Sequence, residues 1–314
     1  MAETEGRSTV AEGAARQLAN ATKTRAQWGG ITPRWLIPFL PWTPAEAGIY
    51  RLNRVKETRG ATAASSTASV ESSPPKDRDA ELPETFVDYE EDPREYFLNA
   101  VTTILDVQTR VSDLYSRPFD QTQEQLRLLI EKVKERQEYE LINNPEYGLL
   151  TNVASQQVIT TRSGAPTPDD LDELISKVWK EPAFFLAHPR AIAAFGRECT
   201  RRGVPPPTVT LFGNPFLTWR GLPLVPSDKV PLTSAGGSKI LLLRTGEKKQ
   251  GVVGLFQPGV PGEVSPSLSV RFMGINRKAI ASYLISLYTS LAILTEDAVA
   301  VLDGVEVGRY HDYS

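Results

Sequence analysis

Cysteine and histidine are scarce in this chain of 314 residues. The single cysteine, Cys199, rules out a disulfide framework and a cysteine-based zinc site. Two histidines, His188 and His311, leave little material for a histidine-based metal centre. We therefore expect no metal site, and a protein that works in a reducing, intracellular compartment.

Excess positive charge and long apolar runs are also missing. Lys and Arg number 35 against 38 Asp and Glu, a net charge of −3. This balance argues against nucleic acid as the main partner, because binding phosphates requires a basic surface. The most apolar uncharged run, 279–294, contains four hydroxyl residues and is shorter than the roughly 18 residues of a membrane-spanning helix. The first ten residues are polar and predict no secretory signal, so we expect a cytoplasmic protein without a membrane span.

The sequence has none of the common catalytic patterns. His188 and Cys199 fall on one predicted helix, where the helical rise separates them by roughly 16 Å. A nucleophile and its base need to be about 3 Å apart. The stretch 234–239 lacks the spacing of a phosphate-binding loop, and neither G-x-S-x-G nor H-E-x-x-H occurs. We expect no catalytic residues, no cofactor-binding residues and no enzymatic activity.

Aromatic residues, 8% of the chain, are concentrated near its N-terminus. Three of the five tryptophans, Trp28, Trp35 and Trp42, lie in one stretch together with Leu36 and Phe39. Four prolines in the same stretch exclude a long helix, so these large side chains cannot bury one another locally. They need a surface to pack against. The residues alone leave open whether that surface belongs to the same chain or to a neighbour.

A long hairpin is predicted after this arm. Residues 49–55 alternate apolar and polar side chains and predict a strand, and 85–89 predict a second one. The segment between them, 57–80, has almost no large apolar residues and cannot bury a core. We expect it to be a mobile loop at the tip of the hairpin.

The remaining pattern predicts an α+β fold. Helices are expected at 11–21, 120–142, 168–180 and 189–202. The second has the clearest apolar periodicity, Thr167 and Asp170 predict a capping box at the start of the third, and Gly203 ends the fourth. Strands are expected at 100–114, 208–211, 216–219, 239–243, 251–256 and 267–272. The apolar segment 278–301 is compatible with either a helix or a strand.

The order of these elements resembles one known architecture. The segments that carry the likeness are ITPRWLIPFLPW, IYRLNRV, QEQLRLLIEKVKERQEYELINN, PEYGLL, LFGNPFLTWRGLPLVPSD, AIASYLISLYTSLAILTEDAVAVL and VEVGR. They resemble the tailed-phage major capsid protein (Hong Kong 97-type) fold and, within it, the encapsulin nanocompartment shell proteins of family 2A. The likeness covers the whole chain except the polar loop at 57–80.

The resemblance implies a division into four parts. These are an N-terminal arm at 1–47, an extended E-loop at 48–96, a P-domain at 97–180 and 265–314 with its spine helix at 120–142, and an A-domain at 181–264. It also implies that the ambiguous last segment is a P-domain strand. The arm residues Trp28, Trp35, Leu36, Phe39 and Trp42 then become candidates for contacts between subunits.

The resemblance further implies a self-assembling icosahedral shell, on the order of sixty copies, that encloses a cargo enzyme. In family 2A the cargo is a cysteine desulfurase bound through a disordered segment of its own, which links the shell to sulfur metabolism. Any pyridoxal phosphate belongs to the cargo, so this chain needs no cofactor. The candidate pore loop at the fivefold axis is Arg201, Arg202, Gly203, Val204 and Pro205.

Two other functions remain as alternatives. A major capsid protein of a phage or prophage has the same fold around a different interior. An unrecognised small-molecule enzyme would be a monomer or small oligomer with turnover.

Overall fold

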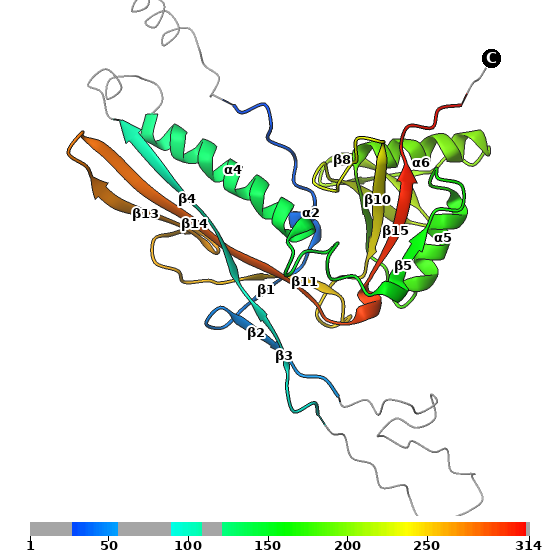
Figure 1. Ribbon diagram of the computed structural model, residues 1–314, viewed down its shortest axis with the longest axis horizontal. Helices are drawn as coiled ribbons and strands as arrows, with labels where there is room; N and C mark the ends of the chain where they lie inside the picture. The colour runs from blue at the N-terminus through cyan, green and yellow to red at the C-terminus, as the bar shows by residue number, and fades with distance from the viewer. Residues whose placement is uncertain (1–26, 56–88, 109–120, 312–314) are drawn as a thin grey trace, which may run out of the picture.

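The computed structural model describes residues 27–55, 89–108 and 121–311. This part of the chain forms two large β-sheets, each with its own helices, and a two-stranded ribbon. The arm packs between the two large sheets (Figure 1). The predicted helix at 11–21 and the predicted loop at 57–80 lie outside the described residues, as does most of the predicted strand at 85–89.

A six-stranded sheet with one long helix forms the first half. Its centre is the antiparallel pair of the longest strands, in which Ile280–Ile293 runs along Asn99–Gln108 from end to end. The strands are β1 (Trp42–Pro44), β4 (Asn99–Gln108), β11 (Val252–Phe256), β12 (Glu263–Ser265), β13 (Leu268–Ile275) and β14 (Ile280–Ile293).

The long helix α4 (Gln121–Asn143) lies across one face of this sheet (Figure 1). Its apolar side chains recur at helical spacing and pack against alternate residues of the strands beneath, such as Ile285 and Leu287 of β14. The structure confirms the helix predicted at 120–142. The strand predicted at 100–114 is confirmed as β4, whose described part ends at Gln108.

The second half is built on a seven-stranded sheet. Its strands, in spatial order, are β5 (Val158–Thr160), β15 (Val299–Glu306), β10 (Gly237–Leu243), β6 (Phe184–Ala187), β9 (Leu222–Pro226), β8 (Asn214–Trp219) and β7 (Thr208–Leu211). All four residues of β6 and the last four of β10 are apolar and buried, which is typical of a sheet that is buried on both faces.

Helices α5 (Pro168–Lys177) and α6 (Pro189–Arg201) cover one face of the second sheet. Both begin where the sequence predicts; α6 ends one residue before the predicted position 202, and α5 ends at Lys177, three residues before the predicted position 180. Thr167 and Asp170 form the expected capping box on α5, and the His188 ring accepts a hydrogen bond from the Arg190 amide at the start of α6. The opposite face of the sheet packs on the arm, the end of α4 and strands β11 and β14.

The predicted last strand is two strands in different sheets. β14 belongs to the six-stranded sheet; after the short 3-10 helix η2 (Glu296–Ala298) the chain enters the seven-stranded sheet as β15. β11 falls in the range expected for the A-domain but pairs with β14, whereas β5 and β15 fall in the ranges expected for the P-domain but lie in the other sheet. The sheets therefore do not divide the chain at the expected boundaries, because strand pairing over long sequence separations decides sheet membership.

A two-stranded ribbon and two short helices complete the described chain. The ribbon of β2 (Ile49–Leu52) and β3 (Arg94–Phe97) leaves the six-stranded sheet near the start of β4 (Figure 1). β2 confirms the strand predicted at 49–55, and its described partner is β3; of the predicted strand at 85–89, Tyr89 forms an isolated bridge to Val55. Short helices α2 (Leu36–Phe39) and η1 (Ser155–Gln157) lie in the arm and before β5.

Candidate assembly surfaces

The arm lies in the joint between the two sheets. Its helix α2 sits between the end of α4 and the seven-stranded sheet, and β1 continues as a parallel partner of β11 (Figure 1). A four-residue helix is all that the prolines at positions 38 and 41 permit, since each removes a backbone donor and restricts the residue before it.

Carboxylates of α4 hold the polar side of the arm. The amide of Thr32 donates to Glu135 Oε1 at 2.7 Å, the Arg34 guanidinium pairs with Glu131 Oε2 at 2.6 Å, and the Leu36 amide donates to Glu138 Oε1 at 3.1 Å. These contacts satisfy backbone N–H groups of an irregular segment that no strand or longer helix would pair.

The two inner carboxylates of α4 differ in their electrostatics. Burial raises the pKa of Glu138 to about 6, in spite of the Leu36 amide and the Lys229 charge, which act the other way. Burial also pushes the pKa of Glu135 up, but hydrogen bonds from Lys229 and Thr32 outweigh it and leave that pKa below its usual value. Lys229 Nζ lies 2.6 Å from Glu135 Oε2.

Aromatic side chains hold the apolar side of the arm. Trp35 meets Phe216 of β8 edge to face, with ring centroids 5.2 Å apart, and Phe39 contacts Phe184 of β6 at 5.0 Å. The Trp42 indole packs flat on β11 at Gly254, where an added Cβ would lie 2.6 Å from its ring. Gly254 is therefore the residue that lets Trp42 approach the strand.

For part of the arm, the structure shows that the large apolar side chains pack against their own chain. Leu36 is fully buried in its own chain, so in this conformation it has no surface to offer a neighbour, contrary to the expected subunit contact. Trp35, Phe39 and Trp42 are half-buried by the same joint. Trp28 is 42% exposed, with Lys132 Nζ above its ring at 5.0 Å, and is the arm tryptophan with the most free surface in the described chain.

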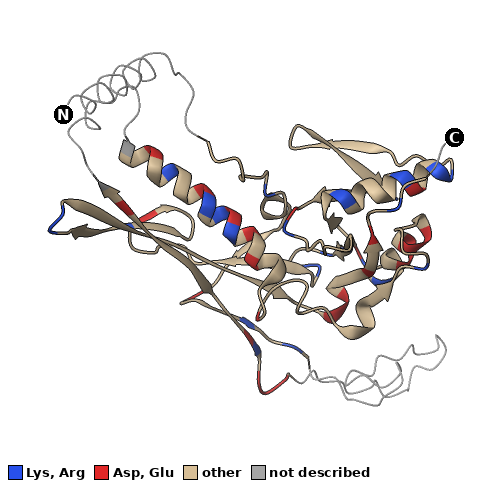
Figure 2. Ribbon diagram, turned by 45° about the horizontal axis from the view of Figure 1, so that its top comes forward, with Lys and Arg blue, Asp and Glu red and all other residues tan. Residues whose placement is uncertain are grey.

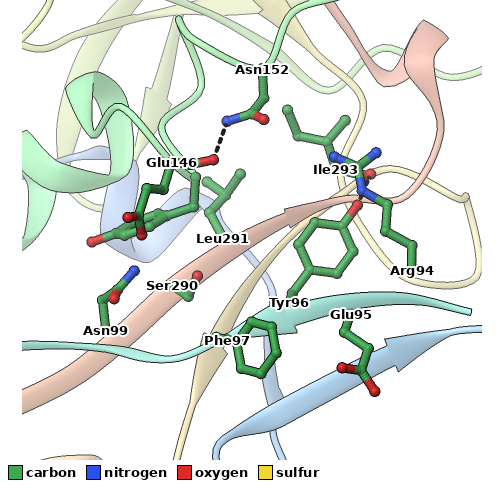
Figure 3. Close-up of a pocket in the computed structure, with 11 residues that line it drawn as sticks. Arg94, Glu95, Tyr96, Phe97, Asn99, Glu146, Asn152, Ser290, Leu291 and Ile293 are labelled. Atoms are coloured by element: carbon green, nitrogen blue, oxygen red, sulfur yellow. Dashed lines mark hydrogen bonds between the residues drawn. The ribbon is translucent and has the colours of Figure 1, made fainter.

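The root of the β2–β3 ribbon is anchored by tyrosine. The Tyr96 hydroxyl donates to the carbonyl of Ile293 at 2.6 Å, and burial raises the pKa of this phenol. Figure 3 shows the cavity beside it, about 160 Å³, lined from several elements by residues that include Arg94, Glu146 and Ser290. Asn152 closes one side by donating to the Glu146 carbonyl at 2.9 Å (Figure 3).

Beyond this anchor the ribbon exposes large apolar side chains. Val55, Tyr89 and Phe97 are all about half or more exposed. A two-stranded ribbon is marginally stable by itself, and exposed aromatics on it indicate a surface that needs a partner.

The six-stranded sheet also ends in an exposed apolar tip. The residues are Phe272, Met273 and Ile275 on β13, with Ile104 on β4, and each has more than half of its surface free. This exposed tip lies at the end of the β13–β14 hairpin farthest from the seven-stranded sheet (Figure 1). The sequence gives no warning of it, because alternating strand residues are as compatible with a buried face as with an exposed one.

The candidate pore loop follows α6 at the outer end of the second half. Gly203, with φ +71°, ends the helix: the Gly203 amide bonds to the carbonyl of Thr200, and the Val204 amide to that of Cys199. Arg201, Arg202, Gly203, Val204 and Pro205 are all exposed. In Figure 2 the ribbon is coloured blue for Lys and Arg at this end of α6, near the C-terminus.

One buried carboxylate organises this loop. Glu198 accepts hydrogen bonds from Arg201, at 3.0 Å, and from Arg202, and its Oε1 lies 2.9 Å from His311 Nε2. Burial opposes ionisation of Glu198, but these three partners outweigh it and lower its pKa. The structure thus places His311, the fourth residue from the end of the sequence, against α6.

The candidate metal ligands and nucleophiles of the described part of the chain include Cys199 and His188. No group of three or more His, Cys, Asp or Glu side chains there could hold a metal ion. Cys199 is buried, and burial raises the pKa of its thiol to about 11, so it packs as a small apolar residue. His188 caps α6 at the opposite end from Cys199, as the spacing predicted. No described helix is long and apolar enough to cross a membrane.

Sequence reasoning missed the partners that receive the arm. Glu135 and Glu138 fall outside the apolar periodicity from which the helix was predicted, but both are buried under the arm. Their spacing, with Glu131 one turn earlier, places three carboxylates along one side of the helix, and this was the available signal. Lys229 and the aromatic residues Phe212 and Phe216, which contact Trp35 and Phe39, gave none, because they are distant from the arm in sequence.

Comparisons with known proteins agree with this architecture. A profile of the family described as type 2A encapsulin shell protein, SrpI-like, matches residues 55–309. The type 2A encapsulin shell protein SrpI of Synechococcus elongatus is 68% identical over 300 residues, which cover 96% of this chain and 95% of the relative.

Solved structures show the same relationship. The holo-SrpI encapsulin complex from Synechococcus elongatus matches with a TM-score of 0.82 and 65% identity, over 96% of this chain and 98% of that one. A protein of Microbacterium phage Oxtober96 shares the fold, with a TM-score of 0.61 at 12% identity, over 92% and 98% of the two chains. The fold is thus the predicted Hong Kong 97-type capsid fold, and the chain belongs to the type 2A encapsulin shell protein family.

Proposed function

We propose that this chain assembles with itself into a closed icosahedral shell, on the order of sixty copies, that encloses a cargo enzyme. Two observations together support the proposal: the chain belongs to a family of shell proteins, and it leaves large apolar side chains exposed. The tip at Phe272, Met273 and Ile275 and the ribbon residue Phe97 are exposed, whereas the central strands of the seven-stranded sheet are packed on both faces. Such exposed apolar patches mark surfaces that a partner covers.

Within this shell the parts keep the roles that the resemblance implied. The β2–β3 ribbon belongs to the E-loop, α4 is the spine helix of the P-domain, and the loop Arg201–Pro205 lines the fivefold opening. Of the arm residues, Trp28 is the best candidate for a contact between subunits, since it retains the most free surface.

The phage-capsid alternative has less support. The matched phage protein is 12% identical, which speaks for the fold alone, whereas the shell protein SrpI is 68% identical over nearly the whole chain. Mass photometry and negative-stain electron microscopy of the purified full chain test assembly. Hollow particles of megadalton mass are expected. A species of single-chain mass would contradict the proposal.

The cargo is proposed to be a cysteine desulfurase, held through a disordered segment of the cargo itself and serving sulfur metabolism in the cytoplasm. Support comes only from the family. Purification of the particles from their native cells, followed by mass spectrometry, tests it. A pyridoxal-phosphate enzyme in the particle fraction is expected, with that cofactor bound to the cargo. A different enzyme there would overturn this part and leave the shell proposal standing.

A further inference from the structure

One ionic cluster ties the arm to both halves of the molecule. Glu135 of α4 binds Thr32 of the arm and Lys229, which lies in the loop between β9 and β10 of the seven-stranded sheet. Lys229 Nζ also donates to Thr32 Oγ1 at 3.0 Å, and the Lys229 carbonyl accepts from Asn143 Nδ2 at 2.8 Å. We call Thr32, Leu36, Glu135, Glu138 and Lys229 the arm clamp.

Glu138 is the most enclosed member of the clamp. Its side chain is 1% exposed, and it hydrogen-bonds the Leu36 amide and the Ser227 hydroxyl. The charges that face it are Glu135 on its own helix and Lys229 from the loop; Lys229 in turn pairs with Asp228 at 2.6 Å.

Two further charges lie at the edge of the clamp. Arg34 of the arm spans Glu131 and Glu135, and His188, at the start of α6, approaches Asp228; burial lowers the pKa of this histidine. None of these groups pairs directly with Glu138, so its carboxylate is held by neutral donors while Glu135 takes the nearby cation.

We propose that the arm clamp is a proton-sensitive lock, in which Glu138 takes up a proton and thereby tightens the hold of the arm between α4 and the seven-stranded sheet. A docked arm buries the carboxylate, and a released arm returns it to water. Burial penalises the ionised form, so protonation favours the docked state.

The direction of the pH effect follows from linkage. The pKa of Glu138 in the docked state is about 6, above the ordinary value of 4.5, so docking weakens as the pH rises through 6. If Glu138 has its ordinary pKa of 4.5 in the released state, the equilibrium constant for docking should be roughly 5- to 10-fold larger at pH 5 than at pH 7.5. Glu135, whose pKa is lowered, stays mostly ionised over this window and keeps its ion pair.

Hydrogen exchange of the full chain, measured by mass spectrometry at pH 5 and 7.5 and corrected for intrinsic rates, tests the lock. Arm amides 31–44 should exchange roughly 5- to 10-fold more slowly at pH 5. The isosteric variant Glu138→Gln mimics the protonated acid, so it should show the slow rate at both pH values. Lys229→Met removes the ammonium group that binds Glu135 and Thr32, so it should raise the exchange rate of the arm amides at both pH values.

Glu140→Gln is the matched control, because Glu140 lies on the same helix and pairs with Arg136 instead of the arm. It should behave like the unmodified chain. Equal exchange of the arm at pH 7.5 in the unmodified chain and in Glu138→Gln would overturn the proposal, as would equal corrected exchange of the unmodified chain at pH 5 and 7.5. Particle mass, recorded on the same samples, reports shell assembly separately, so a failed lock and a failed shell are distinguishable.

Discussion

The two sheets of this chain differ in how completely the chain covers them. The seven-stranded sheet has α5 and α6 on one face and the arm, the end of α4 and two strands on the other. The six-stranded sheet has α4 on one face and ends in an exposed apolar tip. The seven-stranded sheet is therefore a core that the chain completes by itself, while the six-stranded sheet is the one that we propose another copy of the chain covers.

Two phenylalanines give the sharpest comparison. Phe195 of α6 is fully buried and meets Trp219 at 5.5 Å, whereas Phe272 of β13 is 57% exposed and meets Tyr283 at the same distance. Phe195→Ala should lower the free energy of unfolding by about 3–5 kcal/mol through the cavity it leaves. Chemical denaturation followed by circular dichroism measures this. A loss of less than about 1 kcal/mol would contradict the claim that Phe195 lies in a core that the chain completes by itself.

A buried ion pair near the junction of the halves should be almost as sensitive. Arg244 is 1% exposed and donates to Asp297 Oδ1 at 2.6 Å. Asp297→Ala leaves this charge buried without its carboxylate, at a cost of about 3 kcal/mol or more in unfolding free energy. Thermal and urea unfolding of the variant check this. Unchanged stability would show that Thr295 and backbone carbonyls satisfy the guanidinium alone.

The same pair predicts a pH dependence. Burial raises the pKa of Asp297, but hydrogen bonds from Arg244, Thr295 and Lys180 outweigh it and hold the pKa well below its ordinary value. Its contribution to stability is therefore complete above about pH 4 and is lost as the pH falls below that. In Asp297→Ala the acid limb of the stability curve between pH 4 and 2 should flatten.

The arm should respond less strongly to change. Gly254→Ala places a methyl group against the Trp42 ring, so the arm must shift off β11. We expect a loss of about 1–3 kcal/mol, together with a changed tryptophan emission spectrum. Gly259→Ala, in a turn where an added Cβ meets nothing within 4 Å, controls for loss of glycine, although its φ of +75° adds some strain. An unaltered spectrum in Gly254→Ala would show that the arm does not depend on this contact.

The smallest effect on stability is expected at the exposed tip. Phe272→Ala should change the free energy of unfolding by less than about 1 kcal/mol. It should nevertheless reduce the fraction of chains in particles, measured by mass photometry, because it removes apolar area proposed to face a neighbour. Full assembly of this variant would remove the tip from the proposed interface.

Local patterns made much of the fold predictable. The apolar periodicity of α4, the capping box at Thr167 and the glycine that ends α6 all depend on neighbours in sequence, and the structure confirms each. Six short strands of the described chain escaped prediction, namely β1, β3, β5, β6, β9 and β12, and two of them show why. β6 is a bare run of four apolar residues, and β9 contains two prolines, which usually argue against a strand inside a sheet.

What could not be predicted depends on long-range pairing. The transfer of β15 to the second sheet and the burial of Glu135 and Glu138 under the arm both join segments more than 50 residues apart. At the candidate surfaces, the aromatic arm was noticed from composition. The packing of part of the arm inside its own chain could not be predicted from composition. The exposed tip at Ile275 became visible only once the register of β13 and β14 was known.

A cryo-EM map of the assembled full chain tests the central claim most directly. If another copy completes the six-stranded sheet, atoms of a neighbouring copy should lie within about 4.5 Å of Phe272 and Ile275. A closed particle in which both side chains face solvent would contradict the account.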